Sequence, residues 1–313
     1  MNDVPAKLPI TAIILAFNEE IHIGRCVARL TSLVERIVVI DSFSTDQTVE
    51  IAKSLGAEVL QNKFKSHAAQ FQWGIDEAQI ATAWTMRIDS DEYLEPSLQA
   101  AIATRLTNTP LEIAAFGFKF KVIFKGKFIR WGGYYRLWKT ALWRTGFGQI
   151  EQRWMDEKIV ISSGETVRLT GGDLVDENLK DIGWWTDKHN RYATLQMIDF
   201  VARKYGLFQI DQRLETVGNR DARWRRFLRN KVYGGAPLYL RALLYFVQRY
   251  FLRLGFLDGR MGFVWHTLQG FWFFMLMDAK IDEAELHIAE HGVESFPAYL
   301  KNRYGIDDLA PSN

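Results

Sequence analysis

The chain has 313 residues, of which 48% are hydrophobic, and 39 Lys and Arg oppose 37 Asp and Glu for a net charge of +2. This size provides for one large domain, or one domain with an appendage, and the charge balance excludes a polycation that binds partners by overall charge. The single cysteine, Cys26, excludes an intramolecular disulfide and indicates a reducing compartment. No signal-peptide pattern follows Met1 and no uncharged apolar run reaches ~18 residues, so we expect a cytoplasmic protein without a spanning helix.

Strand and helix patterns alternate through the first hundred residues. Apolar runs predict buried strands over residues 10–16, 36–40, 57–60 and 84–88. Helical patterns separate these runs over residues 21–33, from a capping box at Ser44–Gln47 to Leu55, and over 67–78. This order predicts an α/β fold with a doubly wound, mostly parallel sheet flanked by helices, in which ligands bind at the carboxyl ends of the strands.

Acidic side chains follow three of the predicted strands where each strand ends. They are Glu19 and Glu20 after the first strand, Asp41 at the second, and Asp89 and Asp91 at the fourth. Asp89 and Asp91 stand at i and i+2 and therefore project from the same side of an extended chain. Two such oxygen ligands suit a Mg²⁺ or Mn²⁺ ion that also holds substrate phosphates. The alternative is an acidic turn or a helix N-cap.

The pattern changes beyond residue 110. Residues 116–124 alternate as a half-exposed strand does, and an aromatic loop over 131–138 contains Arg136. The acidic pair Asp156 and Glu157 precedes a short predicted strand at 159–161. A helix is predicted over 184–205, with Lys188 and Arg191 near its start.

The motifs at residues 15–20, 41–48 and 89–92, in this order and at this spacing, resemble those of the inverting family-2 glycosyltransferases of the GT-A fold. The segments around Arg136, Asp156 and Lys188 resemble the bacterial branch of that family that assembles lipopolysaccharide core and exopolysaccharide. The resemblance implies a glycosyltransferase that moves a sugar from a nucleotide-sugar donor, a UDP-sugar, to a hydroxyl of a lipid-linked, lipopolysaccharide or exopolysaccharide acceptor with inversion.

The resemblance also implies roles for individual residues. In such an enzyme three residues line the pocket for base and ribose, a fourth contacts the base, and two aspartates hold the metal that bridges the donor diphosphate. The matching positions are Phe17, Asn18 and Glu19 for the pocket, Asp41 for the base, and Asp89 and Asp91 for the metal, with Asp89 also near the ribose.

Transfer to a hydroxyl also needs a carboxylate that removes the acceptor proton. The resemblance places this general base at Asp156 or Glu157, with Glu151 as a third candidate, and the alternative for the pair is a solvated turn. Arg136, Lys188 and Arg191 are candidate donor-binding residues for the diphosphate, and the alternative for the helical residues is an ordinary charged face.

Two other functions were weighed against sugar transfer. A sugar-1-phosphate nucleotidyltransferase shares the sheet and the metal but typically has a glycine-rich loop after the first strand, and residues 16–20 contain no glycine. A nucleic-acid-binding protein would use the basic segment 220–231, but at 100° per residue its charges spread around a helix, so no nucleic-acid partner is expected.

The C-terminal part is predicted to bind a membrane surface without crossing it. Residues 237–256 form an apolar helical pattern in which Arg241, Arg249 and Arg253 share an arc of about 120° and are expected to reach lipid phosphates. We therefore expect a catalytic domain over residues 1–235 and an amphipathic helical region over 236–313, peripheral on the cytoplasmic face of the inner membrane. The alternative is that this segment and a second apolar segment, residues 262–277, pack against the catalytic domain or a second subunit as ordinary core helices.

Overall fold

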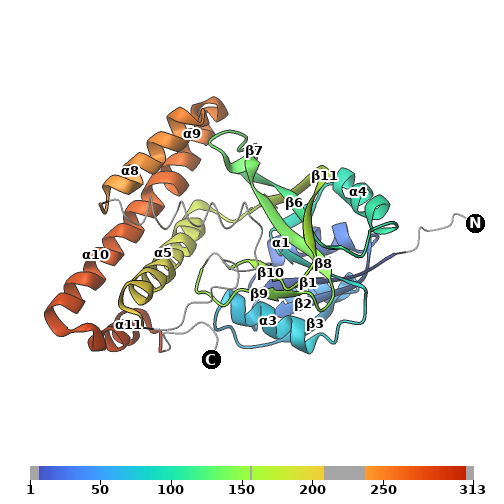
Figure 1. Ribbon diagram of the computed structural model, residues 1–313, viewed down its shortest axis with the longest axis horizontal. Coiled ribbons are helices and arrows are strands. Elements are labelled where there is room, and N and C mark those ends of the chain that lie inside the picture. Colours follow the sequence, from blue (N-terminus) through green and yellow to red (C-terminus); the bar gives the residue numbers. More distant parts are fainter. Residues whose placement is uncertain (1–6, 156, 208–236, 308–313) are drawn as a thin grey trace, which may run out of the picture.

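The computed structural model describes residues 7–155, 157–207 and 237–307, and it consists of an α/β layer beside a layer of helices (Figure 1). One sheet with the strand order β3-β2-β1-β4-β8-β6-β11-β5 forms the α/β layer, and β7 pairs with β6 at its side. Strands β9 and β10 pair separately. The strands are β1 (Leu8–Ala16), β2 (Val34–Asp41), β3 (Glu58–Gln61), β4 (Trp84–Asp89), β5 (Glu92–Leu94), β6 (Ile113–Phe124), β7 (Lys127–Phe128), β8 (Trp138–Arg144), β9 (Gly148–Ile150), β10 (Ile159–Ile161) and β11 (Glu165–Glu177).

The parallel half of the sheet confirms the predicted fold class. Strand β1 pairs in parallel with β2 and β4, and β2 with β3, and the helices α1 (Glu20–Leu30), α2 (Thr48–Ser54) and α3 (His67–Glu77) connect them. Strand β1 is apolar throughout because Ile14 packs into the core on one face of the sheet and Ile13 into the core on the other. In the register, Leu15 is paired with Asp89 and Ala16 with Asp41, so the three strand ends meet at one edge.

The other half of the sheet is mixed. Strand β8 pairs antiparallel with β4 and β6, whereas β11 runs parallel to β6 and antiparallel to β5. Helix α4 (Pro96–Leu106) packs against β11. Strand β11 was not predicted from the sequence, although its far end returns the chain to the edge where β1, β2 and β4 end.

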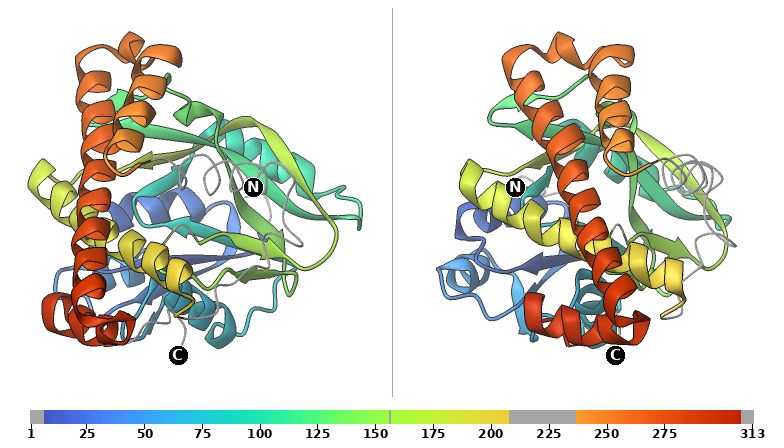
Figure 2. Two further views of the ribbon diagram at one scale, coloured as in Figure 1. Left: turned by 60° about the vertical axis from the view of Figure 1, so that its left-hand side comes forward. Right: turned by 90° about the vertical axis from the view of Figure 1, so that its left-hand side faces the viewer.

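The helical layer consists of one long helix from the middle of the chain and the C-terminal helices. Helix α10 (Phe273–His291) crosses α5 (Ile182–Tyr205), as both views in Figure 2 show, and the two helices bury Met197, Met277 and Ile281 between them. The remaining helical elements are η1 (Tyr134–Arg136) in the sheet layer and α8 (Leu240–Val247), η3 (Gln248–Leu252), η4 (Gly255–Asp258), α9 (Gly259–Thr267), η5 (Leu268–Trp272), η6 (Val293–Ser295) and α11 (Phe296–Tyr304) here. Among the described residues, no helix is both long enough and apolar enough to cross a membrane.

Two local predictions are wrong. The segment Ser44–Gln47 is not a capping box, because α2 begins at Thr48 and has no side-chain cap. Ser44 instead donates its hydroxyl proton to Asp41 at 2.5 Å. The acidic side chain of this segment, Asp46, accepts hydrogen bonds from the Thr48 backbone and from Glu20 N.

The other correction concerns the predicted helix over residues 237–256. It ends at η3, since Leu254 has a φ of +59°. Arg241 is only 2% exposed and forms an ion pair with the buried Asp278 of α10, and Arg249 donates to the carbonyl of Gly132 at 2.8 Å. The ion pair of Arg241 lies inside the helical layer, and half-buried Arg249 ties this layer to the loop at Gly132, so the prediction that these two arginines reach lipid phosphates is wrong. The expected domain boundary near residue 235 and the basic segment 220–231 lie outside the described residues.

Candidate active site

The turn after β1 is fixed by side chains of the loop that precedes α2. Asn18 has a φ of +54°, its backbone N–H donates to Ser44 Oγ at 2.8 Å, and its side-chain oxygen accepts from Thr45 N at 2.8 Å. The Glu19 N–H donates to Thr48 Oγ1 at 2.7 Å. Phe17 has no such restraint and is 55% exposed, as an aromatic platform for a flat ligand would be.

Asp41 lies at the end of β2 and is fully buried. Its carboxylate accepts from the backbone and hydroxyl of Ser44 and, at 2.9 Å, from Gln61 Nε2 of β3. Asp41 therefore ties the ends of β2 and β3 to the loop that holds Asn18.

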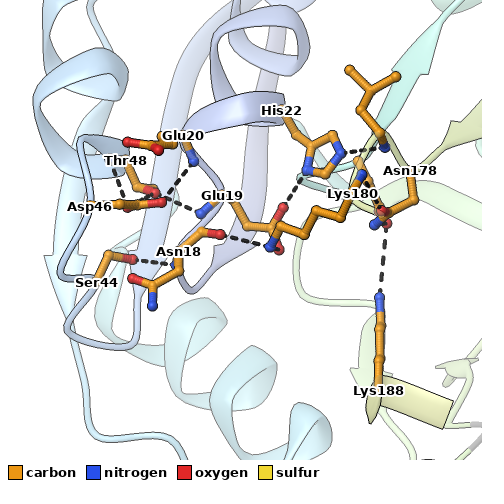
Figure 3. Close-up of polar contacts among 12 residues, drawn as sticks. Asn18, Glu19, Glu20, His22, Ser44, Asp46, Thr48, Asn178, Lys180 and Lys188 are labelled. Atoms are coloured by element: carbon orange, nitrogen blue, oxygen red, sulfur yellow. Dashed lines mark hydrogen bonds and ion pairs between the residues drawn. The ribbon is translucent and has the colours of Figure 1, made fainter. Parts of the chain in front are cut away.

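The turn after β1 is also joined to the segment that follows β11 (Figure 3). Glu19 accepts from Lys180 Nζ at 2.8 Å and pairs with His22 Nδ1 at 2.5 Å, while the other ring nitrogen of His22 accepts from Leu179 N at 2.8 Å. Lys180 Nζ also donates to the carbonyl of Asn18 at 2.7 Å. Neither His22 nor Lys180 was predicted from the sequence to belong to the site.

Asp89 ends β4 within reach of two cations. Its carboxylate lies 2.9 Å from Lys139 Nζ of β8 and 3.4 Å from Arg87 Nε. Although desolvation acts to raise the pKa of Asp89, the charges of Lys139 and Arg87 outweigh it and hold the pKa below its ordinary value. Buried Glu92 accepts from the Asp89 backbone N–H at 2.9 Å and pairs with Lys139 at 2.6 Å, which fixes the turn after the strand.

Asp91 faces the segment after β11 and the start of α5. Its carboxylate accepts from Asn178 Nδ2 at 3.0 Å and lies 3.9 Å from Lys188 Nζ. Burial acts to raise the pKa of Asp91, but Lys188 and Asn178 outweigh it and keep the group ionised. Burial and the nearby charges of Asp91 and Glu92 raise the pKa of Asp176, a further carboxyl at this edge, well above its ordinary value.

The predicted general base Glu157 is linked to Asp89 by Arg87, which contacts both carboxylates. Arg87 Nη2 donates to Glu157 Oε1 at 2.9 Å, and both side chains are 9% exposed. One guanidinium therefore bridges Asp89 and Glu157 across the strand end. Asp156 lies outside the described residues, and Glu151, the third candidate, is fully buried.

Of the three predicted donor-binding cations, the structure brings only Lys188 to this edge. Its ammonium lies 4.9 Å from the Trp184 ring centroid and 5.6 Å from that of Tyr192, which also places these two aromatic side chains beside Asp91. Arg191 is exposed on α5, and Arg136 is exposed on η1. In the described part of the chain, no hydrogen bond or ion pair joins either arginine to Asp89 or Asp91.

The carboxylates at this edge suit a metal ion whose coordination shell is completed by a substrate. The described residues contain no cluster of three or more His, Cys, Asp or Glu placed to hold a metal alone. Asp89 and Asp91 are nevertheless both ionised, and Asp89 keeps 37% of its side chain exposed. Mg²⁺ is typically bound by one or two carboxylates together with substrate phosphates and water, so this donor set fits such an ion.

A mixed sheet with turn residues, strand-end carboxylates and lysines gathered at one edge defines an α/β fold of the GT-A type. Residues 11–165 match the family model described as glycosyl transferase family 2. The chain belongs to glycosyl transferase family 2.

The chain is similar to several curated proteins of this kind. It is 34% identical over 93 residues to an uncharacterised glycosyltransferase of Rickettsia typhi, a match that covers 30% of this chain and 31% of the relative. It is 33% identical over 98 residues to the lipopolysaccharide core biosynthesis glycosyltransferase LpsC of Rhizobium meliloti, covering 30% of this chain and 35% of LpsC. The matched segment thus spans about a third of the length of these curated relatives.

The chain also matches two solved structures that hold a nucleotide or a nucleotide sugar. TarS of S. aureus, in complex with UDP-GlcNAc, matches 90% of this chain and 92% of its own at 12% identity with a TM-score of 0.44. Glucosyl-3-phosphoglycerate synthase of Mycobacterium tuberculosis, in complex with Mg²⁺ and UDP, matches 37% of this chain and 44% of its own at 23% identity with a TM-score of 0.30.

Proposed function

We propose that the protein transfers a sugar from a nucleotide-sugar donor, a UDP-sugar, to an acceptor hydroxyl with inversion of the anomeric configuration. The observation that carries the proposal is the pair of ionised aspartates at the end of β4, each beside a lysine: Asp89 with Lys139 and Asp91 with Lys188. Such alternating charges suit a metal-bound diphosphate, because the ion takes the carboxylates and the lysines face the phosphate oxygens.

Asp91, with Asp89, would hold a Mg²⁺ or Mn²⁺ ion. When bound, such an ion neutralises the negative charge of a departing diphosphate as a Lewis acid. Lys188 would add a second positive charge on the α5 side, and the Trp184 ring beside it limits where its ammonium can lie.

The donor nucleoside would lie over the turn after β1. Phe17 offers an exposed ring for stacking, and Asn18 and Glu19 are held by the loop before α2 and by Lys180. Asp41 would hold this support from the end of β2 through its bonds to Ser44 and Gln61, and its contact with the base stays a prediction. This support is rigid before the ligand arrives, which lowers the entropy lost on binding.

The acceptor proton would be removed by Asp156 or Glu157. Glu157 is one guanidinium away from Asp89, so a base at this position is close to the metal-binding edge. Direct attack by the acceptor oxygen on the face opposite the leaving diphosphate inverts the anomeric carbon. The arginines Arg136 and Arg191 remain predicted donor ligands without a contact to the metal-binding aspartates.

The acceptor is proposed to be lipid-linked, as a lipopolysaccharide or exopolysaccharide precursor is. The name of the relative LpsC supports this class of acceptor. We further propose that residues 1–235 are the catalytic domain and that the helical region 236–313 places it on the cytoplasmic face of the inner membrane as a peripheral protein. The apolar side chains that α8 exposes, Leu240, Leu243 and Leu244, support a surface contact of this kind.

The proposal is tested by incubating the full chain with a panel of nucleotide sugars and measuring release of nucleoside diphosphate with and without Mn²⁺. We expect release from a UDP-sugar that depends on the metal and rises when lipid extract supplies an acceptor. The variant Asp91→Asn serves as the control, because it keeps the shape of the side chain and removes the charge. Absence of release from every donor, or equal release by Asp91→Asn, would contradict the proposal.

A further inference from the structure

A strongly basic cleft, separate from the candidate active site, lies where the sheet meets the helical layer. It has a volume of about 470 Å³ and is formed by β6, by the loop that leads into η1, and by the end of η3. Four cationic side chains line it: Lys119, Arg130, Arg136 and Arg253. The proposed donor site at the ends of β1, β2 and β4 is called the strand-end site below. None of the roles proposed for it uses Lys119, Arg130 or Arg253.

The four cations form no ion pair in the part of the chain that is described. No carboxylate there lies within ion-pair distance of any of them, and the charge of Asp258 acts on Arg130 only at longer range. Asp258 accepts instead from the backbone N–H groups of Arg130 and Trp131, at 3.2 and 2.9 Å. Burial, and then the charge of Arg249, lower the pKa of Arg253, and the charge of Arg136 adds to this, as expected for a cation in a positive field.

The chain restrains two of these cations, Arg253 and Lys119. The backbone N–H of Gly132 donates to the Arg253 carbonyl at 2.9 Å. Gly133, at a φ of +86°, leaves room for the Arg253 side chain, since a Cβ there would lie 2.6 Å from Nη1. Lys119 Nζ lies 3.7 Å from the Tyr135 ring centroid. The cleft is therefore built before any ligand binds, and its net charge calls for an anion.

An exposed apolar ridge, defined here as residues 251–257, borders the cleft. Leu252 and Leu254 line the cleft and are 75% and 41% exposed, and three further apolar side chains of the ridge are 43–52% exposed: Phe251, Phe256 and Leu257. Five large apolar side chains are thus exposed within seven residues, and such a concentration marks a candidate interaction site. Cations beside such a ridge match the boundary of a bilayer, where phosphates lie above acyl chains.

We infer that this cleft binds the phosphate of an anionic membrane phospholipid while the ridge at 251–257 enters the headgroup boundary. The inference refines the peripheral location proposed above and rests on it, but it does not depend on which sugar is transferred. It also replaces Arg241 and Arg249, which are engaged inside the protein, by a set of basic side chains that are free to meet lipid. Arg253 is the one member shared with the sequence-based expectation.

The test is co-sedimentation of the full chain with vesicles of phosphatidylglycerol mixed with phosphatidylcholine, and with phosphatidylcholine alone. The double variant Arg130→Glu/Arg253→Glu should weaken binding to the anionic vesicles at least about thirtyfold, because each basic residue near an anionic bilayer contributes about a factor of five. The control Lys53→Glu/Arg105→Glu makes the same change of net charge at exposed positions of α2 and α4 and should lose no more than about twofold.

A separate variant, Leu252→Ser, tests the ridge and should weaken vesicle binding by about tenfold without unfolding the protein, since this side chain is already 75% exposed. Equal loss in both charge variants would overturn the inference in favour of unspecific attraction. Equal binding to both vesicle types would overturn it as well, and so would competition by free glycerol phosphate that is as strong as competition by vesicles.

Measurements of dimerisation and of nucleotide binding distinguish a lipid site from a protein interface and from failure of the sugar-transfer proposal. Wild-type protein that ignores anionic vesicles but forms dimers that Leu252→Ser disrupts would show that a second copy covers the ridge, which overturns the inference. Thermal stabilisation of the wild type by UDP and Mn²⁺, measured without lipid, reports on the strand-end site alone. Vesicle binding without nucleotide stabilisation would therefore contradict the sugar-transfer proposal and leave the lipid site standing.

Discussion

Replacing Glu157 by glutamine separates a catalytic carboxylate from a structural one. The amide keeps the volume of the side chain and an oxygen that can accept from Arg87 at the observed 2.9 Å, but it removes the charge. Breaking a buried ion pair outright costs about 3–5 kcal/mol. Because Asp89 still neutralises Arg87, we expect a smaller loss of about 1–2 kcal/mol in the free energy of unfolding.

The effect on turnover is expected to be much larger. A general base contributes roughly 10²–10⁴ in rate, so Glu157→Gln should lower kcat by that factor and leave the KM for the donor nearly unchanged. The assay is initial-rate kinetics with saturating acceptor, accompanied by a thermal melt of each variant. Glu95→Gln is the matched control, since Glu95 pairs with Lys121 at 2.6 Å outside the proposed site, and its turnover should be normal.

The companion variant Asp156→Asn decides between the two members of the acidic pair. Loss of turnover in Asp156→Asn alone would assign the base to Asp156 and leave Glu157 as the partner that positions Arg87. Full activity in Glu157→Gln, with a melting temperature lowered by a few degrees, would also assign the base to Asp156 and a structural role to Glu157. If both variants kept normal turnover, the base assignment would be refuted.

Three further predictions concern the support of the site and of the helical layer. Lys180→Met should raise the Kd for UDP about tenfold or more, measured by calorimetry, because the turn at Glu19 loses its cation, and an unchanged Kd would refute this role. The free energy of unfolding should fall as the pH drops from 6.5 towards 4, because burial lowers the pKa of His266 to about 4 and the unfolded chain therefore takes up the proton first. In urea titrations of His266→Phe, this fall should be smaller by up to about 3 kcal/mol, and a fall equal to that of the wild type would count against this role of His266. Arg241→Ala should cost about 3–5 kcal/mol, and the double variant with Asp278→Ala less than the sum of the two single changes, in a double-mutant cycle by chemical denaturation; additive losses would show that the pair is not coupled.

The parallel half of the fold was predictable because its signals are local. Buried parallel strands are continuous apolar runs, and the acidic residues that end them mark the functional edge. Strand β11 was missed because it mixes exposed and buried positions along thirteen residues, with Gly171 and Gly172 at its irregularity. Its end, Asp176 and Glu177, nevertheless repeats the pattern of carboxylates after an apolar stretch that identified β4, and this signal was available in the sequence.

The partners of the site residues were not predictable, because they depend on tertiary contacts. The sequence placed Glu157 in an acidic pair, but only the packing of β4 against the segment before β10 joins it to Arg87. Helical periodicity put Arg241 and Arg249 with Arg253 on one arc, whereas Asp278 of α10 and the carbonyl of Gly132 bind two of the three. A pattern on one helix does not report which side another element covers.

The central claim is that Asp91 and Asp89 hold a divalent metal together with the diphosphate of a nucleotide-sugar donor. The most direct measurement is anomalous diffraction from crystals of the full chain grown with UDP and Mn²⁺. We expect an anomalous peak within about 2.0–2.6 Å of an Asp91 carboxylate oxygen, beside the diphosphate, and its loss in crystals of Asp91→Asn. A UDP molecule bound without such a peak, or a peak at another place in the molecule, would contradict it.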